Sequence, residues 1–366
     1  MTTQQKLDLI KQVGEEIVTE EELRQVLTSG EELVAYDGIE PSGQLHIAQG
    51  ILRAININKV TKTGIRFKIL LADWHAMCND KMGGDLEKIK TVGKYFIEIW
   101  KACGMDLKNM EFVWASDLVK DSRYWELVLK IGRTNKLARF VRTAEFMGRE
   151  AAAENLSAAQ LFYPCMQIAD IFTLNAKVAQ LGMDQRKVNM LAREIGPQLG
   201  FWKPVSVSHH MLMGLGQPPA GENSTDKASR TIALKMSKSH PDNAIFMTDS
   251  REDVERKINK AWCPEGEIKE NPILEYCKYI IFESLDKLGI DKITIERPAK
   301  FGGNVALKSY QELETLFDQK KIHPQDLKQT VAKLINDLIE PVRQHFIKNK
   351  TARALLEQVK SFTVTR

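Results

Sequence analysis

The 366-residue sequence has few cysteines, and none of them stand at metal-binding spacing. The five residues are odd in number, widely scattered and form no Cys-x-x-Cys pair; they are Cys78, Cys103, Cys165, Cys263 and Cys277. This arrangement argues against a disulfide framework and against a zinc site. We therefore expect a reducing compartment, the cytoplasm, and no metal held by the protein itself.

Long apolar runs are also absent. No window approaches the roughly 20 apolar residues that a membrane span needs, and residues 1–18 mix acids and bases, unlike a secretion signal. The net charge of +4 permits a polyanionic partner without demonstrating one. Neither a G-x-x-x-x-G-K-[ST] loop nor a G-x-G-x-x-G fingerprint occurs. Their absence disfavours P-loop nucleotide hydrolases and dinucleotide-dependent dehydrogenases.

Short apolar runs alternate with helical patterns in the first part of the chain. The runs at 34–36, 67–72 and 112–115 read as strands, and residues 86–103 read as a helix between the last two. This alternation predicts an α/β fold with a Rossmann-like, doubly wound parallel sheet, in which ligands bind beyond the carboxyl ends of the strands. Three polar residues follow the first two runs and either line such a cleft or brace its loops: Glu40, Asp73 and His75.

Both ends of the chain read as helical. Thr19 to Glu22 has the spacing of a capping box, and Ser309 to Glu312 repeats it. Gly302-Gly303 predicts a small hairpin or a loop, and a final helix carries the apolar residues between 331 and 342, with a kink at Pro341. We expect a catalytic domain over residues 1–248, with an inserted helical segment near 120–160, and a mostly helical domain over 249–366.

One segment after the first strand has residue types suited to phosphate. Residues 41–43, Pro-Ser-Gly, form a tight turn, and residues 45–49, Leu-His-Ile-Ala-Gln, are expected to open a helix. The N-terminus of a helix offers N–H groups and a partial positive charge to an anion. His46 and Gln49 are three residues apart and share one helical face. The alternative for His46 is a simple capping or surface role.

A second such segment lies at residues 235–239, Lys-Met-Ser-Lys-Ser. Lys235, Lys238 and two serines form a compact set of donors. Such a set suits a triphosphate whose leaving pyrophosphate gains charge in the transition state. The alternative is a solvated basic loop.

A polar face marks the segment from 163 to 170. We expect Pro164 at the first helical position, which places Tyr163, Gln167 and Asp170 on one side of an otherwise apolar helix. Buried polar groups without partners cost about 1–3 kcal/mol each. A ligand with an amino group and a hydroxyl would provide partners, whereas the alternative is a face exposed to solvent.

The two phosphate segments resemble the HIGH and KMSKS motifs of class I aminoacyl-tRNA synthetases. Gln49 stands where the first motif has its second histidine, so a donor is kept but a possible positive charge is lost. The segments FYPCMQIADI and LGMDQRKVNMLARE further resemble tyrosyl-tRNA synthetases of the archaeal and eukaryotic type. The resemblance covers the chain from about residue 30 to its end.

This resemblance implies a function and a set of roles. The enzyme would activate L-tyrosine with ATP and Mg²⁺ and transfer it to tRNA(Tyr). Tyr36, at the end of the first strand, and Asp170 would hold the phenolic hydroxyl, while Tyr163, Gln167 and Gln185 would surround the α-amino group. Asp184 is expected to cap the helix that follows, with Arg186 and Lys187 as surface charges. The rivals are a tryptophanyl-tRNA synthetase and a non-catalytic RNA-binding paralogue.

The C-terminal part resembles the anticodon-binding domain of the same family, on the segment ERPAKFGGNVALKSYQELE and the later KKIHPQDLK. The resemblance places Phe301, His323 and Asp326 near the anticodon, and an exposed phenylalanine is suited to stacking on a base. A core role for Phe301 and a capping role for His323 are the alternatives. The resemblance also implies a homodimer. A basic stretch faces either the acceptor stem or the dimer interface; it comprises Arg123, Arg133, Lys136, Arg139 and Arg142.

Overall fold

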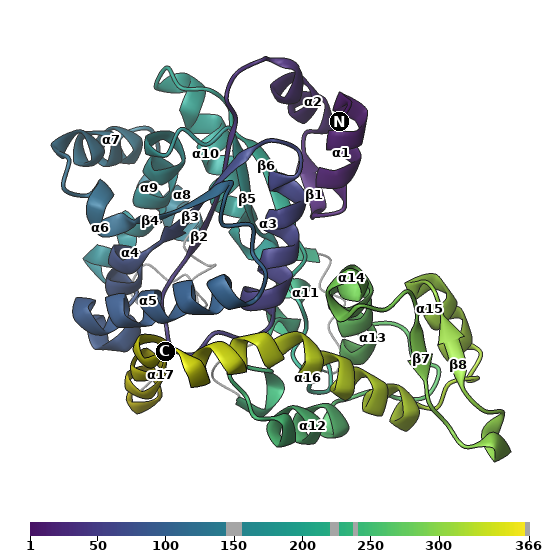
Figure 1. Cartoon of the computed structure of the whole chain (residues 1–366). Coiled ribbons are helices and arrows are strands. Elements are labelled where there is room, and N and C mark those ends of the chain that lie inside the picture. The colour runs from purple at the N-terminus through teal and green to yellow at the C-terminus, as the bar shows by residue number, and fades with distance from the viewer. Residues whose placement is uncertain (144–155, 220–226, 237–240, 363–366) are drawn as a thin grey trace.

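The structure is a computed structural model that describes residues 1–143, 156–219, 227–236 and 241–362. Its central sheet has six strands in the order β1-β6-β5-β2-β3-β4 (Figure 1). The strands are β1 (Gly14–Val18), β2 (Val34–Ile39), β3 (Arg66–Leu71), β4 (Met110–Trp114), β5 (Val178–Gly182) and β6 (Val205–His209). All neighbours run parallel except β1, which pairs antiparallel with β6. The predicted α/β class with a mostly parallel sheet is confirmed.

The strand at Gly14–Val18 corrects the expectation that this end of the chain is entirely helical. The sequence here is Gly-Glu-Glu-Ile-Val, and Glu16 and Ile17 pair with residues of β6. The flanking helices are α1 (Thr3–Lys11) and α2 (Glu20–Thr28), and the predicted capping box at Thr19 is confirmed in α2. The pairing partner of β1 lies almost 200 residues away in sequence, so the local pattern does not reveal this strand.

Side chains alternate between two apolar layers on the two faces of the sheet. Along β2, Ala35 enters one core while Val34 and Tyr36 enter the other, as the two-residue period of a strand requires. The first layer lies under α3 (Arg53–Thr61) and α5 (Leu86–Ala102), and the second under α7 (Ser122–Gly132), α9 (Ala158–Thr173) and α10 (Arg186–Gln198). The shorter helices are α4 (Asp73–Cys78), α6 (Ala115–Leu118), α8 (Leu137–Thr143) and α11 (Lys227–Leu234). The predicted insert near 120–160 is therefore helical where it is described, and its residues 144–155 lie outside the described ranges.

The chain after residue 250 is mostly helical, as expected. Its helices are α12 (Arg251–Lys260), α13 (Pro272–Tyr276), α14 (Leu285–Leu288), α15 (Tyr310–Asp318), α16 (Pro324–Lys348) and α17 (Lys350–Ser361). The predicted hairpin is confirmed: β7 (Ile293–Ile295) and β8 (Val305–Leu307) pair antiparallel. Two details differ. The helix through Pro341 is not the last, because α17 follows it. At Ser309 only half of the capping box forms, because the Glu312 carboxylate accepts from the Lys308 N–H instead.

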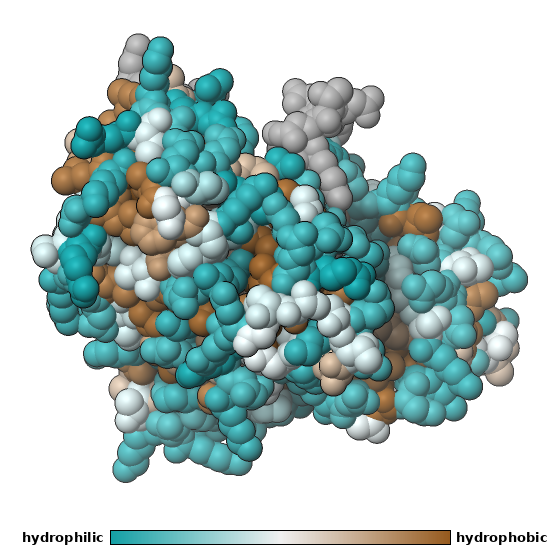
Figure 2. All heavy atoms as spheres, turned by 90° about the horizontal axis from the view of Figure 1, so that it is seen from above, coloured by the Kyte–Doolittle hydropathy of each residue, from teal (hydrophilic) through white to brown (hydrophobic). Residues whose placement is uncertain are grey.

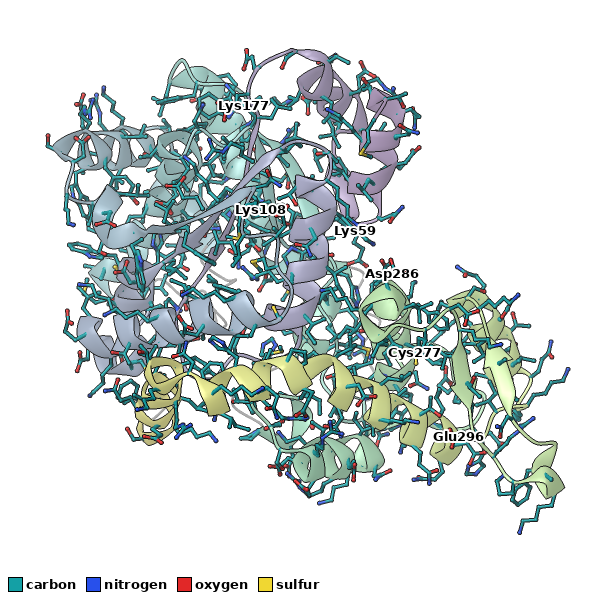
Figure 3. The ribbon with its side chains drawn as sticks, in the orientation of Figure 1. Lys59, Lys108, Lys177, Cys277, Asp286 and Glu296 are labelled. Carbon is teal, nitrogen blue, oxygen red and sulfur yellow. The ribbon has the colours of Figure 1, made fainter. Side chains whose placement is uncertain are left out.

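The C-terminal helices share a core with the sheet domain. Tyr95 of α5 packs against Phe346 of α16 with ring centroids 5.5 Å apart, and α17 lies beside α5 (Figure 1). Lys59 of α3, labelled in Figure 3, reaches Glu283 next to α14 at 2.7 Å. All five cysteines are free thiols, and Cys165 and Cys277 are buried. None of the helices in the described ranges combines the length and apolar character that a bilayer crossing requires.

Candidate active site

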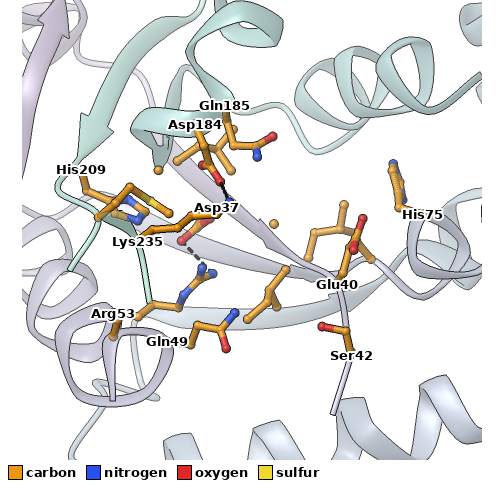
Figure 4. A pocket seen from close by; sticks show the side chains of 18 of the residues that line it. Asp37, Glu40, Ser42, Gln49, Arg53, His75, Asp184, Gln185, His209 and Lys235 are labelled. Carbon is orange, nitrogen blue, oxygen red and sulfur yellow. Dashed lines mark hydrogen bonds and ion pairs between the residues drawn. The ribbon is translucent and has the colours of Figure 1, made fainter. Parts of the chain in front are cut away.

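A cleft of about 350 Å³ opens at the carboxyl ends of β2, β5 and β6 (Figure 4). This is where ligands bind in open parallel sheets. Every residue predicted to contact the amino acid or ATP lines it, apart from Lys238 and the two serines of the lysine-rich segment, which lie outside the described residues. These lining residues are Tyr36, His46, Gln49, Tyr163, Gln167, Asp170, Gln185 and Lys235.

The segment around His46 is fastened to the segment that follows the lysine-rich loop. His46 forms an antiparallel bridge with Phe246. The Ile47 N–H donates to the Ile245 carbonyl at 2.8 Å, and the Met247 N–H donates to the Leu45 carbonyl at 2.9 Å. Backbone hydrogen bonds thus fasten the first motif to residues 245–247, which follow the second motif in the chain.

The helix after this segment begins later than predicted. His46 precedes it, and its first turn is a π-helix, η1 (Ala48–Leu52), which continues into α3. The N–H groups of Gln49 and Gly50 both donate to the His46 carbonyl at 2.9 Å. With the Ile47 N–H also paired, these backbone donors are not available to an anion. The side chains of the turn must therefore carry more of any phosphate binding than the sequence suggests.

Lys235 stands at the end of α11, where Met236 N–H donates to the Leu212 carbonyl at 3.0 Å. Its ammonium group lies 3.1 Å from the Asp184 carboxylate (Figure 4). Asp184 therefore serves as an ion-pair partner and makes no side-chain cap, contrary to the expectation. Arg186 is not a simple surface charge either, because it pairs with Glu16 of β1 at 2.6 Å.

A second ion pair lies at the floor of the same cleft. Asp37, in the middle of β2, is 1% exposed and its Oδ2 lies 2.8 Å from Nη1 of Arg53. Burial raises the pKa of Asp37 to about 7, although the guanidinium opposes this shift. Neither residue was predicted from the sequence, and Figure 4 shows both pointing toward one another beside Gln49.

The opposite end of the cleft is closed by a network around Asp170. This carboxylate is fully buried, accepts from the Tyr124 hydroxyl at 2.8 Å and lies 3.0 Å from Nε2 of His75. Burial lowers the pKa of His75, but the charge of Asp170 outweighs it and the net shift is upward. Tyr124 was missed by the sequence reasoning because no local pattern distinguishes it from a core tyrosine.

Tyr36 lies in this network rather than at the end of its strand, since β2 continues to Ile39. Burial and the charges of Asp170 and Asp37 raise its pKa well above the usual value, so its hydroxyl keeps its proton. Gly38, two residues on, gives this hydroxyl room: a Cβ there would sit 3.3 Å from the Tyr36 oxygen.

The polar face of α9 forms as predicted, but its helix starts earlier. Ser157 makes a full capping box with Gln160, which places Pro164 inside α9 instead of at its first position. Tyr163 donates to the Glu40 carboxylate at 2.7 Å. Gln167 donates to Gln185 at 3.1 Å. Tyr163, Gln167 and Asp170 are all buried, so the face is not a solvent-exposed one.

Of the three residues with open roles, two line the cleft and one does not. Glu40 and His75 are lining residues. Asp73 is fully buried and braces the backbone, accepting from the Trp74 N–H at 3.0 Å and the Ser116 N–H at 2.9 Å.

The three residues assigned to the anticodon lie in the C-terminal part, away from the cleft. Phe301 is 62% exposed, which excludes the core alternative. His323 caps α16, its Nδ1 accepting from the Gln325 N–H at 3.1 Å, and Asp326 lies in the first turn of that helix. Arg297 connects the loop of Phe301 to the turn before His323, because it donates to the carbonyls of Gly303 and Lys321, each at 2.6 Å.

Comparison with known proteins decides the family. A family model described as class I tRNA synthetases (W and Y) matches residues 28–340. The cytoplasmic tyrosine–tRNA ligase 1 of Arabidopsis thaliana is 47% identical over 366 residues, which cover 99% of this chain and 90% of that protein. The chain belongs to the class I tyrosyl-tRNA synthetases of archaeal and eukaryotic type.

Archaeal members of this synthetase family match equally far along the chain. The tyrosine–tRNA ligase of Saccharolobus solfataricus is 41% identical and is covered to 99%. The structure of a Pyrococcus horikoshii tyrosyl-tRNA synthetase complexed with L-tyrosine superimposes with a TM-score of 0.90 at 37% identity, covering 99% of this chain and all of that one. A tryptophanyl-tRNA synthetase from Aeropyrum pernix, at 18% identity and a TM-score of 0.65, shares the fold alone.

Proposed function

We propose that this synthetase activates L-tyrosine with ATP to tyrosyl-adenylate and transfers the tyrosyl group to the 3′ end of tRNA(Tyr). The observation that carries the proposal is the buried pair of Asp170 and Tyr36 at the closed end of the cleft. A phenol hydroxyl can donate to Asp170 and exchange a hydrogen bond with Tyr36. An indole ring has no hydroxyl that could exchange hydrogen bonds with both of these groups.

The first step is an in-line attack of the tyrosine carboxylate on the α-phosphorus of Mg-ATP. A new carboxylate oxygen–phosphorus bond forms as the bond to pyrophosphate breaks. His46, Gln49, Lys235 and Lys238 stabilise the phosphates while negative charge moves to the leaving group. Lys235 is held near the site by Asp184, so its charge is already in place before ATP arrives.

The amino acid is oriented by the polar face of α9. Tyr163 and Gln167, with Gln185, surround the α-amino group, and they already form hydrogen bonds at this end of the cleft. In the second step, a ribose hydroxyl at the 3′ end of the tRNA attacks the activated carbonyl and releases AMP. No side-chain nucleophile takes part.

The tRNA anticodon meets Phe301, His323 and Asp326 in this proposal. Support comes from the exposed ring of Phe301 and from Arg297, which ties its loop to the turn before α16. Arg123 and Arg139 of the basic stretch pair with Asp121 and Glu194, so part of its charge is already compensated. We infer the cytoplasm as the compartment, as named for the Arabidopsis relative.

We also infer a homodimer formed through the insert helices. A hollow of about 330 Å³ lies between α7, α8 and α9, and it is lined mainly by apolar side chains. Leu129, Leu137 and Phe162 are each more than 40% exposed around it. Figure 2 shows hydrophobic side chains gathered on the side where α7 lies in Figure 1. Exposed apolar clusters of this kind mark interaction surfaces.

Tyrosine-dependent exchange of pyrophosphate into ATP tests the proposed function. Exchange that requires tyrosine and is not driven by tryptophan is expected. Exchange driven by tryptophan would refute the pocket assignment, and no exchange with any amino acid would refute the enzymatic function.

A further inference from the structure

The phosphate-facing turn lacks a side chain that can carry a positive charge at position 49. Gln49 lines the cleft, and its carboxamide can donate hydrogen bonds but stays neutral. The charge that builds on a leaving pyrophosphate is stabilised most strongly by cationic groups placed before the reaction. A second cation on the same turn would compensate for this neutral side chain.

Arg53 is such a cation. It stands four residues after Gln49, at the point where the π-turn η1 passes into α3. Its N–H reaches back to the Ala48 carbonyl, the i→i+5 pattern of a π-helix. Residues four apart in such a turn lie one above the other, so Arg53 and Gln49 face the same cleft (Figure 4). Single π-turns of this kind occur frequently at functional sites.

The guanidinium of Arg53 has donors to spare. Its side chain is 10% exposed, and Nη1 lies 2.8 Å from the Asp37 carboxylate. Nε has no acceptor among the described residues. A guanidinium carries five N–H donors in a planar fork, which suits the oxygens of a phosphate group. One carboxylate therefore holds Arg53 in the cleft without exhausting its capacity for a second anion.

Arg53 is held by a carboxylate in the same way as Lys235, the lysine of the second phosphate motif. Lys235 is held by Asp184, which follows β5, and Arg53 is held by Asp37 of β2, the neighbouring strand. Figure 4 shows the two ion pairs close together in the cleft. Each carboxylate thus keeps its cation at the wall of the cleft. An arriving triphosphate is then offered two fixed positive charges.

We propose that Arg53 binds the phosphates of ATP and supplies the positive charge that Gln49 does not, with Asp37 positioning its guanidinium. This inference rests on the proposed tyrosine activation and adds a substrate-binding residue that neither sequence motif contains. The negative charge that moves to pyrophosphate as the α-phosphorus–oxygen bond breaks is stabilised by Arg53 together with Lys235.

The test uses two removals and a rescue. Arg53→Gln removes the charge, and Asp37→Asn/Arg53→Gln does so without leaving a buried carboxylate unpaired. In pyrophosphate exchange, both are expected to lower kcat/KM for ATP roughly 10- to 100-fold, while the KM for tyrosine changes less than about twofold. Arg53→Lys should keep part of the activity, because it retains charge but not the fork.

The rescue separates a binding role from a structural one. Adding Gln49→His to the Asp37→Asn/Arg53→Gln variant places a group that can be protonated on the same turn, and it is expected to restore a measurable part of kcat/KM for ATP. Adenosine has no phosphates, so its inhibition constant as a competitor of ATP should be unchanged in all variants. If adenosine competition weakens as much as ATP use, or if both arginine removals keep full activity, the proposal is wrong. Should the unaltered protein show no tyrosine-dependent exchange, the proposed function fails instead.

Discussion

The imidazole of His210 lies flat against the ring of Tyr279, with centroids 4.0 Å apart and planes 12° from parallel. On its two edges it meets Glu15 of β1 at 3.5 Å and Glu275 of α13 at 3.0 Å. Glu275 also accepts from the Met213 N–H at 3.0 Å. The residue after β6 thus fastens the N-terminal strand, the cleft wall and the C-terminal helices to one another.

His210 makes the stability of this junction dependent on pH. Burial lowers the pKa of His210, but the two glutamates outweigh it and raise the pKa to about 9. A folded-state pKa above the unfolded value of roughly 6.5 contributes stability that is full below pH 6.5 and lost as pH rises through 9. The loss amounts to about 3 kcal/mol at most. Thermal unfolding midpoints should therefore fall between pH 6.5 and 9.5, and His210→Gln should flatten that fall. An unchanged slope in the variant would contradict this assignment.

Asp170 controls the choice between tyrosine and phenylalanine. Asp170→Asn removes a charged acceptor while keeping the volume, and the preference in kcat/KM for tyrosine over phenylalanine should fall by about 1.5–3 kcal/mol, or roughly 10- to 150-fold. Tyr124→Phe is the matched control, because it removes only the hydroxyl that donates to Asp170. It should weaken tyrosine use less and leave the KM for ATP unchanged. Retention of the full preference in Asp170→Asn would show that the phenol is bound elsewhere.

Gly50 is required by the close approach of two segments. A Cβ there would lie 2.5 Å from the sulfur and 2.7 Å from Cγ of the fully buried Met247. Gly50→Ala should destabilise the fold by about 1–3 kcal/mol through overpacking and lower kcat/KM for ATP, because residues 245–247 hold His46. The double variant with Met247→Ala should be more stable than the sum of the two single effects implies. Simple additivity, measured by denaturant unfolding, would rule out the clash.

The elements that local pattern determines were predicted well. The strands predicted at 34–36, 67–72 and 112–115 and the helix predicted at 86–103 match β2, β3, β4 and α5 to within a few residues. The helix start at Pro164 was wrong because Ser157 and Gln160, the actual capping box, lie upstream in a segment without clear periodicity. The strand β1 was missed because its order comes from pairing with β6, which no local pattern records.

The residues of the candidate site likewise divide into those that a local motif reveals and those that only the packing of distant segments reveals. His46, Gln49, Lys235 and the α9 face could be placed because they belong to short motifs with characteristic spacing. Tyr124 could not, because it reaches Asp170 only through the packing of α7 on α9. Arg53 could not, because it reaches the cleft only through the π-turn before α3. Asp184 was assigned to a helix cap because its true partner, Lys235, is 51 residues away.

Arg297 should affect tRNA charging without affecting amino-acid activation. It holds the loop of Phe301 to the turn before His323 through the carbonyls of Gly303 and Lys321. Gly302 and Gly303, with φ of 95° and 70°, adopt a left-handed backbone conformation that residues with side chains rarely take.

Arg297→Gln should lower kcat/KM for tRNA about 10-fold, with pyrophosphate exchange unchanged. Arg66→Gln is the control. Arg66 is the first residue of β3, at the end of the strand opposite the cleft, and this exposed arginine pairs with Glu32. Equal losses in both variants would mean that general surface charge, rather than the geometry of the Phe301 loop, governs tRNA binding.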